Sequence, residues 1–526
     1  MDSSNNKTPG VYINEINAFG GSVVPVATAV PAFIGYTPQA MYEGVLCTNV
    51  PTKITSFGAF QAIFGLPNPP APADPAKQYN PQYYLEAEAS EPEQGDYLLI
   101  GETYYSIVPD PNTVYYLYNS MRLFYENGGG EAYIVSVGSY GPASGVGIAP
   151  GTQIVNPNVQ LKDLLNGLSV LKEAQEPTLY ICPEATLLSV ENNGKLMQAM
   201  LSQCAEMQTS VAILDIIGGR NPDPIMWTED ITVFRNNTGA HGLDYGAAYY
   251  PFVGTTIMQK GDIDYTNLFG GDVKQLRSLI SPVSAPDTKV ETILSHIETP
   301  EENPLTVSQY NHALMMASES YRAIINHILR VVNILPPSGG IAGVITVNDN
   351  QFGPWQPPAN IGMTGVVSLP LKISNTDQAG LNVDAVSGKS INAIRDFIGL
   401  GVLIWGARTL DGNSLDWKYI SVRRTIIFLE QSCKIAIRCY IFQPNDRNTW
   451  ESIKSIITSF LKDVWKAGGL CGALPTDAFS VECGLGSTMN SEDVLNGVIN
   501  VTIKVALLHP AEFIVITFQQ QQATPS

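Results

Sequence analysis

The sequence predicts a multidomain α/β protein, and three observations lead to this prediction. A chain of 526 residues is several times longer than a typical domain of roughly 150 residues. Through the middle of the chain, apolar runs typical of buried strands alternate with amphipathic stretches of helical length. The last third carries two long amphipathic patterns followed by strand-like runs, so it predicts a second mixed region.

The first predicted element is a short strand that has no obvious partner nearby in the sequence. Val11–Ile16 alternates apolar and polar residues between the turn signal Thr8-Pro9-Gly10 and Gly20-Gly21. Such a strand either joins a sheet of its own domain or is added to a sheet of another subunit. Beyond it, residues 57–132 look irregular, and the six prolines of Pro67–Pro81 predict an extended surface loop.

An acidic segment, Tyr83–Pro111, follows this loop and contains no Lys or Arg. Its seven acidic residues are Glu86, Glu88, Glu91, Glu93, Asp96, Glu102 and Asp110. They lack the D-x-D-x-D-G spacing of a calcium loop, and uncompensated carboxylates are costly to bury. The segment therefore predicts a solvent-exposed outer face and no metal site.

The middle region alternates strands and helices. Predicted strands and helices, in chain order, are Ala132–Val137, Leu161–Glu173 (helix), Thr178–Cys182, Leu196–Met207 (helix) and Val211–Ile217. Thr306–Asn333 predicts one long helix that stops before Leu335-Pro336-Pro337.

The last third has the clearest periodicity. Val402–Trp405 predicts a short buried strand, and Lys418–Ile441 predicts a helix. Asn448 and Glu451 are spaced as a capping box for a second helix that ends at Gly468-Gly469. The apolar face of this second helix contains Trp450, Ile453, Ile457, Phe460, Leu461 and Val464. Further strands are predicted at Ala478–Cys483, Ile499–Leu507 and Glu512–Phe518.

Composition favours a surface that is covered by partners. Hydrophobic residues make up 44% of the chain and charged residues only 15%, a low proportion for a monomer in water. The net charge of −19 argues against nucleic acid as the main ligand, because phosphate binding needs a basic surface. No signal peptide and no membrane span are predicted. The seven cysteines contain no C-x-x-C pair and predict buried free thiols in a reducing cytoplasm.

No residue pattern indicates catalysis, a metal or a cofactor. The five histidines include no H-E-x-x-H, and no serine lies in G-x-S-x-G. Gly128-Gly129-Gly130 and the run Gly339-Gly340-Ile341-Ala342-Gly343 lack the phosphate-loop and dinucleotide patterns, so both predict turns. An α/β hydrolase or lyase is therefore a weak alternative to a protein built for assembly.

Positive charge is concentrated in Lys418–Leu470, which contains nine basic and four acidic residues. On the second predicted helix, Arg447, Lys454, Thr458, Lys462 and Lys466 lie opposite the apolar face, with Glu451 as the one acid among them. This pattern is typical of a solvated helix face or of a surface that docks an acidic partner.

A series of motifs from Leu335 onward resembles the contractile tail sheath family in order and spacing. The motifs are Leu335–Gly343, Asn348-Asp349-Asn350, Gly353-Pro354-Trp355, Pro357–Asn360, Ile391–Arg395, Val402–Leu410 and His509–Phe513. Weaker matches occur upstream, at Thr8–Tyr12, Pro31–Gly35, Phe124–Tyr133, Ala212–Asp215 and Tyr245–Phe252. Their order along one chain makes the resemblance specific.

The resemblance implies an α/β sheath protomer, whose core comprises the C-terminal third and the N-terminal arm and carries outward-facing inserted domains. The implied divisions are 1–30 (exchanged N-terminal arm), 31–55 (start of the core), 56–130 (variable outer insertion), 131–334 (middle α/β domain with an insertion near 259–302), 335–510 (sheath core) and 511–526 (C-terminal arm strand and tail).

The resemblance also implies a function and partners. Sheath subunits polymerise helically around an inner tube, on a baseplate and below a tail terminator, and contract to drive the tube into a target cell. Arm strands are exchanged between neighbouring subunits; here they would be Val11, Tyr12, Ile13, Asn14, Glu15 and Ile16, and Phe513, Ile514, Val515 and Ile516. Arg447, Lys454, Lys462 and Lys466 would attach to the inner tube.

The expected subunit assembles in a bacterial cytoplasm, binds no nucleic acid or membrane directly, and becomes part of a phage tail, a tailocin or an extracellular contractile injection system. A baseplate or tail-terminator component with a sheath-like domain is the alternative within the structural class.

Overall fold

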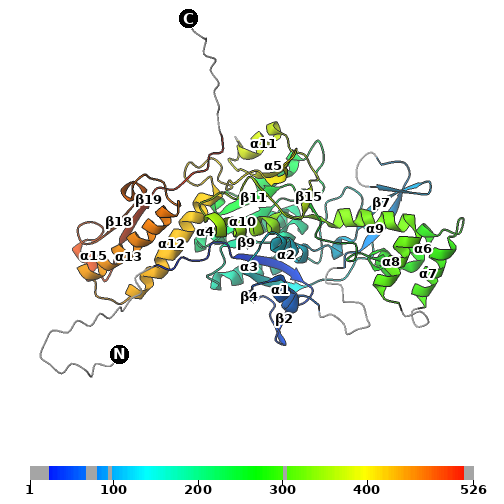
Figure 1. Cartoon of the computed structure of the whole chain (residues 1–526), viewed down its shortest axis with the longest axis horizontal. Coiled ribbons are helices and arrows are strands. Elements are labelled where there is room, and N and C mark those ends of the chain that lie inside the picture. The colour runs from blue at the N-terminus through cyan, green and yellow to red at the C-terminus, as the bar shows by residue number, and fades with distance from the viewer. Residues whose placement is uncertain (1–22, 67–79, 93–96, 300–304, 385, 514–526) are drawn as a thin grey trace, which may run out of the picture. The chain divides into compact units, whose positions relative to one another are not determined.

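The computed structural model describes residues 23–66, 80–92, 97–299, 305–384 and 386–513. The chain divides into two compact units. We call residues 27–427 and 509–526 the body, and residues 1–26 and 428–508 the C-terminal unit. The division falls inside helix α12 (Ile420–Ile437), and thus within the range 335–510 that was expected to form one core. The units are described separately below (Figure 1).

A nine-stranded sheet lies at the centre of the body. Its spatial order is β14 (Ile361–Gly362), β17 (Gly401–Ile404), β16 (Asn392–Phe397), β11 (Gly246–Tyr250), β10 (Val211–Asp215), β9 (Leu179–Ile181), β1 (Pro31–Thr37), β8 (Ala132–Ser139) and β4 (Thr52–Ile54). The six strands from β16 to β8 are parallel, and the remaining strands pair antiparallel at the two edges. Strands β1, β9, β10 and β11 are buried along their whole length, as expected for parallel strands covered on both faces. The α/β prediction for the middle region is confirmed.

Two helix layers cover this sheet. Helices α2 (Leu117–Glu126) and α10 (Ser338–Phe352) pack on each other and on one part of the sheet, while α3 (Leu161–Val170) and α4 (Val190–Met207) form a second packed pair (Figure 1). The predicted turn at Gly339–Gly343 is wrong, because these residues lie inside α10. A Cβ on Gly339 would lie 2.5 Å from the Ser120 carbonyl oxygen, and one on Gly343 would lie 2.6 Å from that of Phe124. The glycines therefore allow close packing of two helices.

The described parts of the region 57–132 form regular elements, contrary to the sequence prediction. It contains α1 (Phe57–Phe64), α2 and an antiparallel three-stranded sheet of β5 (Tyr83–Glu88), β7 (Thr103–Pro109) and β6 (Tyr97–Ile100). Apolar and aromatic residues in these strands form pairs across the sheet that the surrounding acids obscure in the sequence. Within the described residues, Glu86, Glu91 and Glu102 are exposed as predicted, but Asp110 is fully buried.

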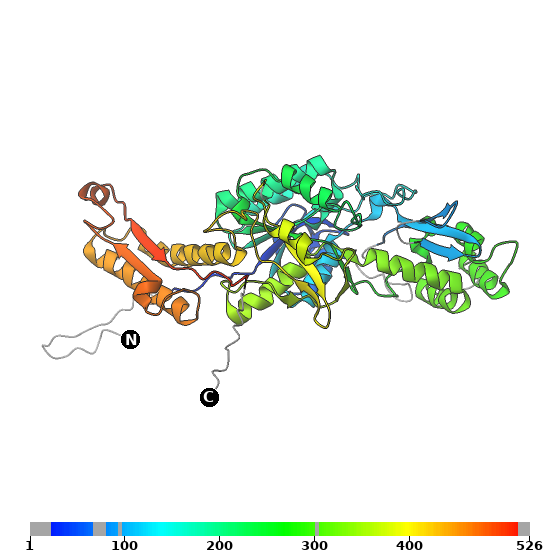
Figure 2. The ribbon, with the colours of Figure 1, turned by 90° about the horizontal axis from the view of Figure 1, so that it is seen from above.

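This small sheet joins a helical segment that is distant in sequence. Helices α6 (Val273–Ile280), α7 (Thr288–Glu298), α8 (Val307–Ala317) and α9 (Glu319–Val332) pack in succession, and α9 contacts β6 (Figure 2). The two ranges expected as separate insertions, 56–130 and 259–302, thus contribute to one substructure. The single helix predicted for Thr306–Asn333 is two helices, because Ser318 is extended and its side chain caps the second one.

Smaller elements complete the body. They are α5 (Thr228–Asn237), α11 (Asn375–Asn382), the hairpin of β2 (Met41–Tyr42) and β3 (Val45–Leu46), and a sheet of β13 (Ile334–Leu335), β12 (Val253–Thr255) and β15 (Val366–Ser368). None of the helices in the described ranges has the length and apolar character needed to cross a membrane.

The C-terminal unit contains the rest of α12, α13 (Arg447–Lys466), α14 (Pro475–Ala478), α15 (Ser491–Leu495) and a hairpin of β18 (Phe479–Cys483) and β19 (Val501–Val505). The predicted helices and the first two strands are confirmed. The predicted cap is wrong: α13 begins two residues earlier, and the Asp446 side chain accepts a hydrogen bond from the Thr449 amide. Its end at Gly468 is as predicted, with Gly468 in the left-handed region.

Candidate assembly surfaces

Helix α13 buries one face inside the C-terminal unit. Ile453, Ile457, Phe460, Leu461 and Val464 are buried, and the helix packs on β18 (Figure 2). The Phe460 ring lies 5.8 Å from the Phe428 ring of α12. This packing fixes which face of α13 reaches solvent.

The four cations of α13 that were predicted to attach to the inner tube differ in their exposure to solvent. Arg447, Lys462 and Lys466 are exposed, whereas Lys454 is half-buried at the margin of the helix face. Burial raises the pKa of the Cys483 thiol on β18, with Glu451 adding to the shift and Lys454 opposing it, so both charged residues lie near this strand. Lys466 also lies 3.7 Å from the Asp463 carboxylate. Three cations therefore offer a solvent-facing charge.

Part of the positive charge counted in Lys418–Leu470 is buried and paired with acidic residues, so it is not available at the surface. Arg423 pairs with Asp244 and stacks 3.8 Å from the Trp417 ring centre, inside the body. Arg424 is also buried, and its Nη1 lies 3.0 Å from the Asp349 carboxylate. Residues 428–508 contain seven Lys or Arg and eight Asp or Glu. The excess of positive charge in the C-terminal unit is thus confined to α13.

Within the described residues, the hairpin of β18 and β19 is joined at its edge only by a single bridge between Leu470 and Leu507, beyond the end of β19. Five residue pairs join the two strands, from Phe479–Val505 to Cys483–Val501. In the part of the chain that the structure describes, no third strand belongs to this sheet. On the face that packs on α13, Val481 and Cys483 are buried, but Ile503 remains 36% exposed. A two-stranded sheet is marginal alone, and its free amides and carbonyls can accept further strands.

The predicted arm strands lie almost entirely outside the described residues. These are Val11–Ile16 and Ile514–Ile516. Phe513 is the last described residue, and its side chain is 75% exposed.

The most perturbed acidic groups are structural. Burial raises the pKa of Glu184 to about 8 and that of Asp215 to about 7. Glu184 accepts a hydrogen bond from the Leu117 amide at the start of α2, at 2.8 Å. Asp215 accepts from the amide and hydroxyl of Ser338 at the start of α10, at 3.0 and 2.5 Å. Each carboxyl thus caps a helix that lacks a capping side chain of its own, in a position closed to substrate.

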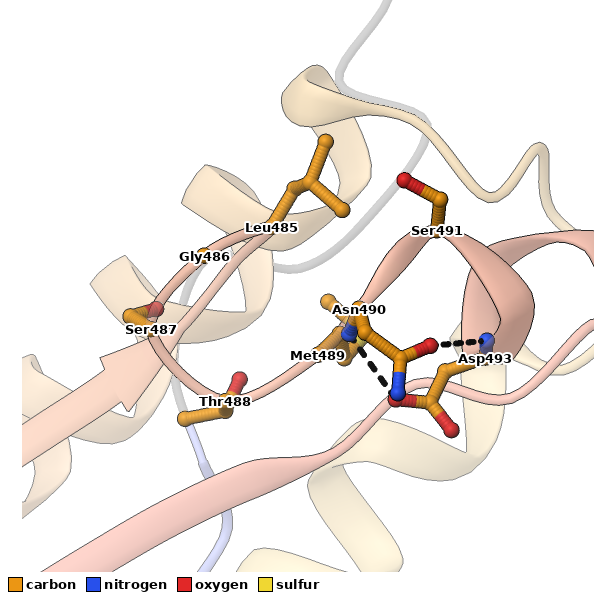
Figure 3. Close-up of a pocket in the computed structure, with 8 residues that line it drawn as sticks. All are labelled: Leu485, Gly486, Ser487, Thr488, Met489, Asn490, Ser491 and Asp493. Carbon is orange, nitrogen blue, oxygen red and sulfur yellow. Dashed lines mark hydrogen bonds between the residues drawn. The ribbon is translucent and has the colours of Figure 1, made fainter.

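A hollow of about 560 Å³ lies on a loop surface of the C-terminal unit (Figure 3). Its walls are Leu485, Gly486, Ser487, Thr488, Met489, Asn490, Ser491 and Asp493. The side chains of Asn490 and Asp493 bond each other's backbone amides, both at 2.9 Å, to cap α15. The polar groups are therefore committed to the local fold. No cluster of metal-ligating side chains is found within the described ranges.

Two cysteines differ from the prediction of buried thiols. Cys439 and Cys471 are exposed, while the other five are buried, and all seven are free. Cys439 lies in the 3-10 helix Arg438–Tyr440 that follows α12, and Cys471 lies in the connection between α13 and α14, where apolar neighbours in the sequence do not enforce burial.

A contact that the sequence did not reveal holds the segment after β19. The buried guanidinium of Arg408 pairs with Glu512, and Tyr419 donates to the same carboxylate. Arg408 and Glu512 are 104 residues apart in the sequence, so the sequence gives no sign that they form a pair. Each residue lies within a motif that resembles the sheath family, Arg408 in Val402–Leu410 and Glu512 in His509–Phe513.

Within the described residues, the notable surface features are thus the edges of the β18–β19 hairpin and the charged face of α13, while the perturbed acids serve as helix caps. Residues 413–521 match the family described as the phage tail sheath C-terminal domain. A segment of 139 residues is 28% identical to the tail sheath protein of Vibrio phage KVP40; it covers 26% of this chain and 20% of that relative. The chain therefore aligns with about a fifth of the length of this curated relative.

Solved structures extend the likeness to the whole fold. The helical sheath of the anti-feeding prophage (AFP) in its contracted state matches with a TM-score of 0.57 and 23% identity, covering 98% of this chain and 99% of the other. The contracted PVC sheath complex, from an extracellular contractile injection system, matches with a TM-score of 0.57 and 21% identity over 98% of both chains. A chain of the contracted AFP baseplate gives 0.58 and 21%, covering 99% and 98%. The resemblance to contractile sheath proteins is confirmed, and the sheath protomer fold spans nearly the whole chain.

Proposed function

We propose that this chain is the structural subunit of a contractile sheath. It polymerises helically around an inner tube, is nucleated at a baseplate and closed by a terminator protein, and contracts to drive the tube into a target cell. Assembly takes place in a bacterial cytoplasm, and the product is a phage tail or a released contractile particle. The role is mechanical and requires no catalysis, nucleic acid or membrane.

The observation that carries this proposal is the open hairpin β18–β19 in a chain with two apolar terminal segments. Val11–Ile16 has the alternation of a strand, and the segment that follows Glu512 begins with the continuous apolar run Phe513–Ile516, which is rich in β-branched residues. Strand addition links subunits through main-chain hydrogen bonds, which tolerate movement of the bodies that they join. An added strand would pair with a free edge of this hairpin and extend the sheet beside Ile503, which is 36% exposed.

The attachment to the inner tube is assigned to α13. Arg447, Lys462 and Lys466 supply exposed positive charge, and Lys454 contributes from the margin of the same face. Individually weak surface pairs become significant when every subunit of a helical polymer repeats them.

The test is to express the chain with and without its cognate inner-tube protein and to examine pelleted material by electron microscopy. We expect long extended tubes with the inner tube present and short, wide, empty tubes without it. Rings or small closed complexes in both samples would instead support a baseplate or terminator component. A monomer in both samples would contradict any assembly role.

A further inference from the structure

The segment His509–Glu512 is bound to the body, although the strand that precedes it belongs to the C-terminal unit. Arg408 Nε donates to both Glu512 oxygens, at 2.9 and 3.2 Å, and Nη2 donates to Oε2 at 2.5 Å. Tyr419 Oη donates to the same Oε2 at 3.1 Å, and the Tyr419 ring lies 6.1 Å from that of His509. We call this arrangement the Arg408–Glu512 clamp.

The body holds Arg408 through contacts that do not involve Glu512. The Asn392 side chain of β16 bonds both the amide and the carbonyl of Arg408, each at 2.8 Å. Arg408 Nη1 donates to the Asn382 carbonyl at the end of α11, at 2.7 Å. Because its backbone and one amino group are already bound, the guanidinium presents its remaining edge in a fixed direction.

The burial of the two charges differs. The Arg408 side chain is 5% exposed and that of Glu512 is 21% exposed, and Phe513 beyond it is 75% exposed. The clamp therefore marks a sharp change from bound to solvent-exposed chain. A buried arginine without its carboxylate would be costly, so the pair is strongly coupled to the position of the segment.

The N-terminal segment is rooted differently. The Val26 amide donates to Ser432 Oγ at 3.2 Å, inside the C-terminal unit. The next contacts, in the body, are the Thr28 carbonyl with Arg424 Nη2 and with Thr178 Oγ1, both at 2.9 Å. The two terminal segments thus leave from different units.

We propose that the Arg408–Glu512 clamp is the anchor of the C-terminal arm. Arg408, Glu512 and Tyr419 act as positioning residues: they fix where the arm leaves the body, so that only the residues beyond Glu512 reach a neighbouring subunit. This inference rests on the proposed sheath function. Releasing the clamp lengthens the connection between the body and the arm, and thus lowers the effective concentration of the arm at its target.

The test compares three variants in a Cys439→Ser, Cys471→Ser background, which removes the two exposed thiols. Glu512→Gln removes the anchor but leaves a buried charge on Arg408. Arg408→Met combined with Glu512→Gln removes the anchor and both charges, so it restores protomer stability without restoring the anchor. Glu492→Gln, on exposed α15, is the matched control.

Two measurements separate anchoring from stability. The first is the mobility of a nitroxide attached through Phe513→Cys, which we expect to increase in both anchor variants and not in the control. The second is the critical concentration for tube formation, which we expect to rise by about twofold or more in both. Recovery of wild-type assembly by the double variant, or unchanged nitroxide mobility, would overturn the inference and make the pair purely structural. If the unaltered chain forms no tubes, the proposed function fails, while the nitroxide result still decides whether the clamp holds.

Discussion

At the scale of single residues, Asp110 shows how an acidic group in an exposed segment becomes structural. Its carboxylate is fully buried at the end of β7. It accepts hydrogen bonds from the Asn112 amide at 3.0 Å, the Ser144 amide and hydroxyl at 2.9 and 2.8 Å, and the Gly145 amide at 2.9 Å. Four donors compensate for desolvation, so the acid ties the three-stranded sheet to the loop that follows β8.

Replacing this carboxylate should therefore destabilise the body. Asp110→Asn would place an amide group against backbone amides, and we expect a loss of about 1–3 kcal/mol in the free energy of unfolding. Denaturant titration of the protomer measures this loss. Glu102→Gln, an exposed acid of the same segment, should change stability little; equal effects of the two substitutions would contradict the structural role of Asp110.

The buried acids Glu184 and Asp215 predict a pH dependence of stability. Their pKa values rise from ordinary values of 4.5 and 3.8 to about 8 and about 7. At a pH between the unfolded and the folded pKa of each group, the folded protein keeps a proton that the unfolded chain has released. The free energy of unfolding therefore falls as the pH rises from about 4 to about 8.

We expect the melting temperature to decrease from pH 5 to pH 8.5, and the variant Glu184→Gln, Asp215→Asn to show a smaller decrease. Asp223→Asn is the control, because backbone amides lower the pKa of this exposed acid and its contribution has the opposite sign. A double variant with the same slope as the unaltered protein would contradict this origin of the pH dependence.

At the scale of elements, the exposed cations of α13 can be substituted without changing the buried face by which this helix packs on β18, so their role in assembly can be tested separately. Reversal of Arg447, Lys462 and Lys466 to Glu should prevent assembly on the inner tube if that tube is acidic, while empty contracted tubes should still form. Each exposed pair contributes on the order of 0.2–1 kcal/mol, so a triple change is needed. Electron microscopy measures the fraction of extended particles, which higher salt should also reduce.

Lys289→Glu, an exposed position on α7 in the body, serves as the control for charge reversal outside α13. Normal extended particles from the triple variant would exclude α13 as the electrostatic anchor. A variant that forms no polymer at all would assign these cations to contacts between sheath subunits.

How far the sequence predicts each element depends on where its determinants lie. The buried strands β9 and β10 were predictable because each is a continuous apolar run between breaks. The break between α8 and α9 depends on the backbone of Ser318, which disrupts no periodicity. The cap of α13 is Asp446 rather than Asn448, since both residue types cap well and only the backbone selects one. The clamp was not predictable, because its partners come from distant segments.

At the scale of the whole molecule, the proposed links depend on terminal segments rooted on different units. Val26 is bonded within the C-terminal unit, and Glu512 is bonded within the body. The predicted divisions 1–30 and 511–526 remain predictions, because most of these residues lie outside the described ranges.

Deletion of Met1–Gly20 should leave a folded protomer that does not form connected tubes. All nine strands of the described body sheet come from residues outside Met1–Gly20, so this deletion removes none of them. The melting temperature should therefore change by no more than a few degrees. A variant with the same residues in shuffled order, lacking the alternation of Val11–Ile16, is the matched control and should fail in the same way. Normal tubes from either variant would contradict strand exchange, and collapse of the fold would place the strand in its own domain.

The separate rooting of the two segments determines how tension would be carried along such a polymer. A pull arriving through the N-terminal segment enters a subunit at the Val26–Ser432 contact, and a pull leaving through the C-terminal segment exits at the Arg408–Glu512 pair. Because the chain continues from Val26 to Thr28, whose carbonyl is bonded in the body, tension that passes the Val26–Ser432 contact would reach the body along the covalent backbone and leave it at the Arg408–Glu512 pair.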